Sequence, residues 1–125
     1  MIEYTVQVDD DGDRYWYFNG NLHREDGPAL EYSDGSRWWY FNGNLHREDG
    51  PALEYSDGSR EWYLNGLRHR EDGPAIEHAD GTRYWYLNGE DYTEEDFIKE
   101  TKATKLTLAE IEELLGYQIK VVNGK

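Results

Sequence analysis

The sequence predicts a mainly β protein, an elongated single antiparallel sheet of β-hairpin repeats with a small C-terminal α/β cap. Two observations carry this prediction. The 22 residues 16–37 occur again, unchanged, at 39–60. Asn-Gly and Asp-Gly pairs also recur with a strict period of 23 residues. A fixed period of this size is typical of stacked-repeat proteins, in which each repeat packs against its neighbours.

The chain is predicted to open with a strand that protects the first sheet edge. Ile2, Tyr4, Val6 and Val8 alternate with polar residues, as expected for a strand with one apolar side. The following segment, "DDDGDR" at 9–14, is interpreted as an acidic hairpin tip. It lacks the Gly and Glu that a calcium-binding EF-hand loop has at its sixth and twelfth positions.

Each copy is predicted to contain a hairpin with Asp-Gly at its tip, because a two-residue type I′ turn favours that pair. Placing Asp34 and Gly35 at the tip pairs Leu30 with Trp39 and Ala29 with Tyr40. On this register the Leu and Trp side is the core and the Ala and Tyr side is more exposed. Four further apolar residues extend the core side: Phe18, Phe41, Leu64 and Leu87.

The recurring segment "HREDGPA", at 23–29, 46–52 and 69–75, is predicted to link one hairpin to the next. Its His and carboxylate residues raise the possibility of a metal site. Equivalent strands lie about 9–10 Å apart, whereas zinc needs ligand atoms within about 2.3 Å. We therefore expect a structural role in the linking turn and predict no catalytic residue, metal or cofactor. A ligand-binding ladder stays open as the alternative.

A change of composition after Asn88-Gly89 divides the chain into a repeat sheet at 1–92 and a cap at 93–125. Thr93 followed by Asp96 predicts a capped helix start. Thr107, Glu110 and Gly116 predict a second helix, and "YQIKVV" at 117–122 predicts a final strand.

Charge and composition restrict the partners that we expect. The 27 acidic and 13 basic residues give a net charge of −14, which disfavours nucleic acid and anionic lipid and favours a basic protein. The chain contains no cysteine, so disulfides and thiolate chemistry are excluded. No signal peptide or membrane span is recognised in the sequence, and we expect a cytoplasmic protein.

Aromatic residues at repeated positions are the candidate partner-binding residues. Exposed Tyr and Trp are favoured at binding hot spots. One set is a regular Tyr ladder, and a second set varies from copy to copy just before the constant Trp; repeated arginines complete the candidates. They are Tyr17, Tyr40, Tyr63 and Tyr86; Tyr15, Trp38, Glu61 and Tyr84; and Arg24, Arg47 and Arg70.

Over residues 12–92 the pattern "WYFNG…HREDGPA…DG" resembles the variant repeats of the MORN-repeat family. The resemblance implies Gly-punctuated hairpins that act as interaction scaffolds. Some proteins with such variant repeats, in bacteria, phages and large viruses, are antitoxins. A lipid-binding role, described for some members, conflicts with the acidity of this chain.

Three functions are consistent with these observations. We expect a non-enzymatic protein-binding module, an antitoxin-like or phage counter-defence inhibitor that engages its target through the aromatic sheet. One alternative is a binder of an anionic planar small molecule, such as a nucleotide signal, through the Arg and Tyr ladders. The other is a structural component, or homo-oligomer, that assembles through exposed sheet edges.

Overall fold

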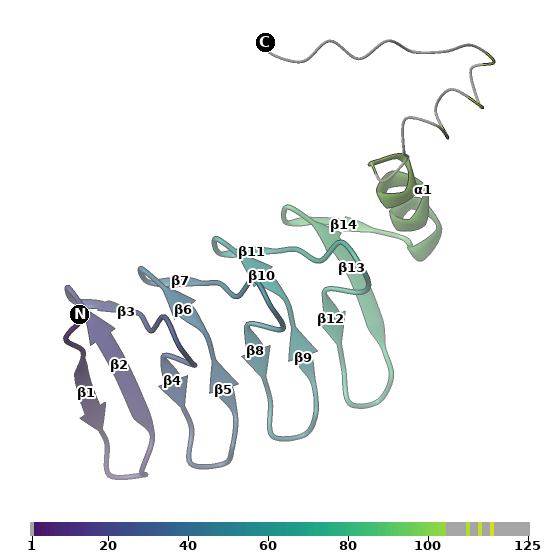
Figure 1. Cartoon of the computed structure of the whole chain (residues 1–125). Coiled ribbons are helices and arrows are strands. Elements are labelled where there is room, and N and C mark those ends of the chain that lie inside the picture. The colour runs from purple at the N-terminus through teal and green to yellow at the C-terminus, as the bar shows by residue number, and fades with distance from the viewer. Residues whose placement is uncertain (1, 105–109, 111–112, 114–115, 117–125) are drawn as a thin grey trace, which may run out of the picture.

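The computed structural model describes residues 2–104, 110, 113 and 116 of the protein. Its strands form one elongated antiparallel meander, with a helix beyond the last strand (Figure 1). In spatial order the main path is β1 (Thr5–Val8), β2 (Arg14–Phe18), β4 (Leu30–Glu31), β5 (Arg37–Trp38), β8 (Leu53–Glu54), β9 (Arg60–Glu61), β12 (Ile76–Glu77), β13 (Arg83–Leu87) and β14 (Glu90–Tyr92). The predicted fold class is confirmed.

Short strands beside the main path complete each copy. They are β3 (Asn21–Leu22), β6 (Tyr40–Phe41), β7 (Asn44–Leu45), β10 (Tyr63–Leu64) and β11 (Leu67–Arg68). β3 pairs with β2, β6 with β7, and β10 with β11. Each pair is joined by an Asn-Gly turn, and these turns line one long edge of the stack (Figure 1).

The Asn-Gly pairs form the two-residue turns. Asn42 has a φ of 49° and Gly43 a φ of 84°, so both central residues are left-handed, as a type I′ turn requires. The other three Asn-Gly pairs have matching values. The flanking residues Phe41 and Asn44 are directly paired, which fixes a loop of two residues.

The predicted type I′ turn at Asp-Gly is wrong. Gly35 has a φ of 96°, but among the described non-glycine residues only the four Asn have positive φ. The Tyr32 N–H donates to Ser36 O and the Gly35 N–H donates to Tyr32 O. This is a three-residue loop, in which a turn is followed by one left-handed Gly. The Asp34 carboxylate stabilises it by accepting the Ser36 N–H at 2.8 Å.

The extra loop residue shifts the pairing by one position. Leu30 pairs with Trp38, not with the predicted Trp39, and Glu31 pairs with Arg37. Side chains alternate between the two sides of a strand, so a one-residue slip exchanges the faces. Leu30 therefore lies on the side predicted for Ala29, and Ala29 lies beside the Trp residues.

The buried core is a thin layer repeated in each copy. The most buried apolar side chains of the sheet are small or aliphatic: Ala29, Leu30, Ala52, Leu53, Ala75 and Ile76. Trp39 and Tyr40 are both half-buried. The prediction of a Trp-lined core opposite an exposed Tyr side is therefore wrong, because each face is covered only in part.

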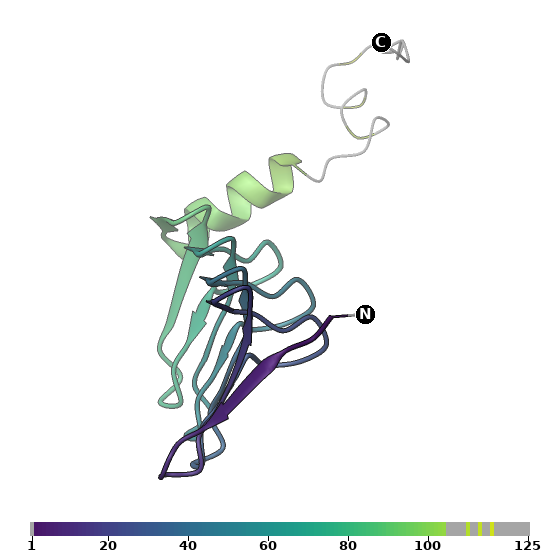
Figure 2. The same cartoon turned by 90° about the vertical axis from the view of Figure 1, so that its left-hand side faces the viewer.

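Both ends of the sheet differ from its middle. β1 forms the first edge, as predicted, and leaves Val6 and Val8 exposed. At the other end α1 (Glu94–Thr104) contacts β13 and β14, at the end of the sheet (Figure 2). The Phe97 side chain of this helix is buried.

The start of α1 matches its prediction, since the Asp96 N–H donates to Thr93 Oγ1 at 3.1 Å. The predicted second helix and final strand fall mostly outside the described residues. Among the residues described, no helix has the length and apolar character needed to cross a membrane.

Candidate binding surfaces

The two faces of the sheet carry different residues. One side, which we call the Tyr face, carries Tyr15, Trp38, Glu61 and Tyr84. Leu30, Leu53 and Ile76 lie between them on the intervening strands and pair with the residue on either side. The alternate residues form the opposite side, which we call the Arg–Trp face. It carries Trp16, Trp39, Trp62 and Trp85. It also carries the Arg residues two positions before each Trp and the Glu residues that pair with these arginines.

On the Arg–Trp face each linking loop places an arginine over a tryptophan. The Arg47 guanidinium lies 3.9 Å from the centre of the Trp39 ring. Arg24 over Trp16 and Arg70 over Trp62 repeat the contact at 4.1 and 3.8 Å. A guanidinium over an indole is a favourable cation–π contact, so the arginines form a lid on the Trp residues.

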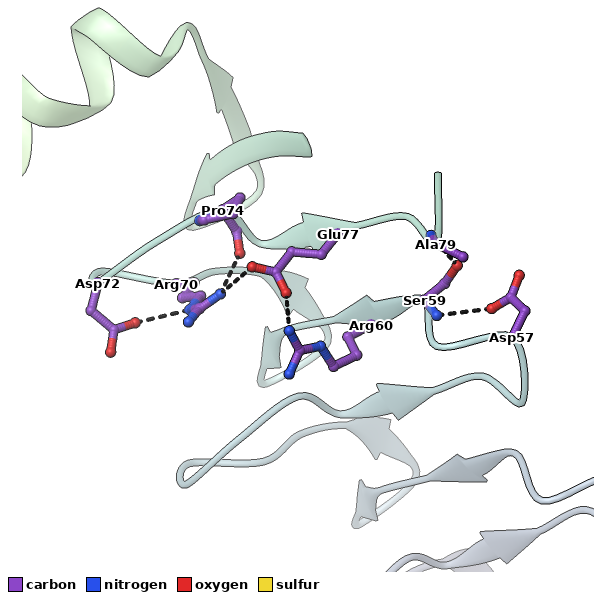
Figure 3. A network of polar contacts seen from close by, with 8 residues as sticks. All are labelled: Asp57, Ser59, Arg60, Arg70, Asp72, Pro74, Glu77 and Ala79. Atoms are coloured by element: carbon purple, nitrogen blue, oxygen red, sulfur yellow. Dashed lines mark hydrogen bonds and ion pairs between the residues drawn. The ribbon is translucent and has the colours of Figure 1, made fainter. Parts of the chain in front are cut away.

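Further hydrogen bonds fix these arginines. We number the copies 15–37, 38–60 and 61–83. In the third copy, as Figure 3 shows, Arg70 donates to the Asp72 carboxylate, the Pro74 carbonyl and the Glu77 carboxylate, at 2.9, 3.0 and 3.2 Å. A Cβ on Gly73 would lie 3.0 Å from the Arg70 guanidinium carbon, so a side chain at this position would require the arginine to shift from its place. The Arg70 guanidinium is therefore held by hydrogen bonds to the linking loop and to the strand that follows it.

A row of alternating charge crosses the same face. Arg37 pairs with Glu54 at 2.8 Å, and Arg14 with Glu31 at 3.4 Å. Figure 3 shows the equivalent contact of Arg60 with Glu77. Directly opposed opposite charges stabilise paired strands modestly. The row therefore helps to fix the register of the sheet.

Each linking histidine joins its own copy to the next. The Asn42 N–H donates to His23 Nδ1 at 2.9 Å, and Asn65 with His46 and Asn88 with His69 repeat the bond at the same distance. The donor is the first central residue of the next Asn-Gly turn. These histidines thus have a structural role, as expected from the sequence.

The Tyr face is a continuous band of aromatic rings. Trp38 lies edge-on to Tyr32 and to Tyr55, with ring centres 5.1 and 6.3 Å apart. Edge-to-face arrangements of this kind are favoured by the ring quadrupoles. Trp38 therefore bridges two copies through their Tyr residues, and the band continues from one repeat to the next.

The third copy replaces part of this band by charge. Glu61 occupies the position of Trp38, and Arg68 occupies the position of Leu45. The two new side chains lie together, with Arg68 Nε 3.6 Å from Glu61 Oε1. Arg68 also lies over Tyr63 and Tyr86, at 5.8 and 5.3 Å. The substitutions compensate one another, and they place a charged spot within an aromatic surface.

Glu61 also holds two tyrosine hydroxyls. Tyr55 donates to Glu61 Oε2 at 3.1 Å and Tyr63 donates to Oε1 at 3.0 Å. Burial, together with the charge of Glu61, raises the pKa of Tyr55 to about 12. Tyr55 is therefore a neutral hydrogen-bond donor at physiological pH.

The acidic tip at the first hairpin is a turn, as predicted. The carboxylates of Asp9, Asp11 and Asp13 offer oxygens within 4.8 Å of one another. Asp9 Oδ1, however, accepts the N–H groups of Asp11 and Asp13, and Asp13 Oδ1 accepts the Ser33 N–H at 2.7 Å. The Asp9 bonds close the turn, and the Asp13 bond joins it to the neighbouring hairpin.

The structure separates the sequence-predicted binding residues into two groups. Eight lie on the Tyr face: Tyr15, Tyr17, Trp38, Tyr40, Glu61, Tyr63, Tyr84 and Tyr86. The arginines Arg24, Arg47 and Arg70 lie on the opposite face and are engaged there.

Sequence reasoning missed Tyr32, Tyr55 and Arg68, which complete the Tyr face. The 23-residue period could have found them, because it aligns Tyr32 and Tyr55 with His78 and aligns Arg68 with Leu45.

No protein-family model, curated protein or solved structure matches this chain.

Proposed function

We propose that the protein is a non-enzymatic, protein-binding repeat module that engages its target through the Tyr face. Its acidity and its resemblance to MORN-type repeats favour an antitoxin-like or phage counter-defence inhibitor. The target is then a protein with a basic surface, since the net charge of −14 attracts one.

One observation carries this proposal: the changes of charge between the first three copies fall on the Tyr face. Glu61 and Arg68 differ in charge from their counterparts, whereas the Trp, Arg and Glu residues of the opposite face recur without change. Framework residues must recur, because every copy makes the same contacts. Residues that vary are free to fit one particular partner, and Tyr, Trp and Arg are the side chains most enriched at binding hot spots.

A nucleotide-like ligand is less favoured than a protein. It would need the repeated arginines as anion donors, and Arg47 already donates to Asp49, the Pro51 carbonyl and Glu54 while its plane lies on Trp39. An anion at this site would have to displace two carboxylates.

Assembly through sheet edges is also less favoured. An open filament needs two complementary edges. Among the described residues no strand pairs with the outer edge of β1, but α1 lies beyond β14 at the opposite end (Figure 1).

The test is affinity capture from bacterial lysate with three tagged forms of the protein, followed by quantitative mass spectrometry. Trp38→Glu introduces on the Tyr face the residue that the third copy already carries. Arg37→Gln, an exposed site on the Arg–Trp face, is the matched control. We expect one protein at stoichiometric amount with the wild type and with Arg37→Gln, and at least about tenfold less with Trp38→Glu. Equal recovery with Trp38→Glu, or no stoichiometric protein, would contradict the proposal.

A further inference from the structure

The N-terminal segment occupies a site in the first copy that the second and third copies leave open. Tyr4 stacks on His23, with ring centres 6.5 Å apart and planes at 29°. Its hydroxyl accepts the Glu25 N–H at 3.0 Å. Two contacts therefore hold a phenol against the first linking loop, on the Arg–Trp face.

The same residues recur in the next two copies without such a ring. His46 and Glu48, and then His69 and Glu71, stand at the positions of His23 and Glu25. Within the described part of the chain, the N–H groups of Glu48 and Glu71 have no acceptor. The His23 side chain is 2% exposed, whereas those of His46 and His69 are 18% and 11% exposed.

Both open positions are grooves between successive linking loops. The groove at His46 has a volume of about 970 Å³ and is lined by Phe41, Leu64 and Trp39, the last of which Arg47 covers. The groove at His69 measures about 640 Å³ and is lined by Leu64 and by Trp62, which Arg70 covers. Each has room for a tyrosine side chain beside apolar residues, which are Phe41 and Leu64 in the first groove and Leu64 in the second.

The rims of these grooves are acidic. Glu25, Asp26, Glu48 and Asp49 line the first groove, and all four are exposed. The Asp residues are paired with the loop arginines. The Glu25 and Glu48 carboxylates lie 3.6 and 3.7 Å from the Nε2 atoms of His23 and His46, and beside neutral histidines they are the excess negative charge. A segment with Lys or Arg beside its tyrosines would match this charge.

We propose that the second and third copies bind two tyrosine side chains of a basic, extended segment of a partner protein. Each phenol stacks on His46 or His69, and its oxygen accepts the N–H of Glu48 or Glu71. This surface lies opposite the Tyr face, so the inference does not depend on the function proposed above.

The repeat spacing sets the spacing of the two tyrosines. Equivalent groups of successive copies are two strands apart, about 9–10 Å. In a polyproline II helix, residues three apart lie on the same side and are separated by about 9.3 Å. The matching segment therefore has tyrosine at every third position.

The experiment is a titration of isotopically labelled protein with the peptide Lys-Tyr-Pro-Lys-Tyr-Pro-Lys, followed through backbone amide resonances. We expect saturable shifts of the Glu48 and Glu71 amides. The Glu25 amide, already bound to Tyr4, is the internal control and stays unchanged. In Tyr4→Ala the Glu25 amide becomes a third responding site.

Two control peptides, used with the wild-type protein, test the need for the tyrosine hydroxyl and for the spacing of three residues. Replacing both tyrosines by phenylalanine removes only the hydroxyl acceptors and should weaken binding about 5-fold for each tyrosine. Inserting one residue between the two tyrosines breaks the match of spacing and should leave only single-site binding.

Several results would overturn the proposal. They are equal affinity for the phenylalanine peptide, equal shifts at Glu25 and Glu48 in the wild type, shifts confined to the Tyr face, or no saturable shift at millimolar peptide. Concentration-dependent self-association that blocks the peptide would assign the grooves to the N-terminal segment of a second copy, and would also overturn it.

Discussion

The two faces of this sheet are built from equally aromatic strands, but their rings have different neighbours. On the Arg–Trp face, Trp39 lies under Arg47, and the same contact recurs in two further copies. On the Tyr face, Trp38 contacts other rings, and its position holds Glu61 one copy later. Adjacent residues of one strand thus serve the fold on one side and are free to vary on the other.

The largest expected effect comes from the two adjacent tryptophans. Trp39→Ala removes the ring that supports Arg47 and should lower the free energy of unfolding by about 3 kcal/mol. Trp38→Ala should cost about 1–2 kcal/mol, because a copy without this ring already exists in the molecule. Urea unfolding of both variants measures the difference. Equal losses would remove the distinction between the faces.

A second, smaller effect concerns the link between copies along the Asp-Gly edge. Ser59 is buried, and its Oγ accepts the Ala79 N–H at 3.0 Å, as Figure 3 shows. Ser59→Ala leaves that N–H without a partner and should cost about 1–2 kcal/mol. The exposed Ser56 provides the control, since its hydroxyl makes only a long bond of 3.5 Å to Asp34 Oδ2 and Ser56→Ala should change stability by less than about 0.5 kcal/mol. If both changes cost the same, the Ser59 contact is not a link between repeats.

An alkaline titration sharpens the contrast on the Tyr face. The folded pKa of Tyr55, about 12, lies above its ordinary value of 10.0. The stability that Tyr55 contributes is therefore complete below pH 10.0 and is lost as the pH rises through about 12. Glu61→Gln should lower this pKa only in part, because burial is the larger cause. The ultraviolet absorbance of tyrosinate, with Tyr55→Phe as reference, measures it. An unchanged pKa in Glu61→Gln would contradict the Tyr55–Glu61 contact.

The smallest effect is expected at low pH in the three-residue turns. The Ser59 N–H bond holds the pKa of Asp57 below its ordinary value of 3.8. The stability that Asp57 contributes is therefore present above pH 3.8 and is lost as the pH falls through its lower folded pKa. Carbon-detected NMR titration reports this pKa, and Asp57→Asn should make unfolding in acid less dependent on pH. A pKa of 3.8 or higher would show that the turn does not use this carboxylate.

Repetition made the architecture predictable from the sequence. The 23-residue period located the Asp-Gly turns, and Thr93 located the start of α1. The two-residue turns at the Asn-Gly pairs, which recur with the same period, were not predicted as turns. The register was not predictable by the same reasoning, because Asp-Gly is compatible with loops of two and of three residues. The difference of one residue exchanged Leu30 and Ala29 between the faces.

The place of the candidate binding residues on the sheet was predictable only in part, for a related reason. Alternation along the strand predicted that Tyr15, Trp38 and Glu61 share one face of the sheet, and in the structure all three lie on the Tyr face. The position of Arg47 over Trp39 depends on how a loop folds back on the sheet, which no local pattern encodes. The contacts of Tyr4 with His23 and Glu25 join residues about 20 positions apart, and no short-range pattern predicts them.

Converting the third copy into the second tests the division between framework and recognition most directly. The double variant Glu61→Trp with Arg68→Leu restores on the Tyr face the residues that the second copy carries there, at Trp38 and Leu45. Its unfolding free energy and its capture of the partner are measured together.

Our account predicts stability within about 1 kcal/mol of the wild type, because the second copy already packs these side chains, and capture at least about tenfold weaker. A loss of stability above about 2 kcal/mol, or undiminished capture, would contradict it.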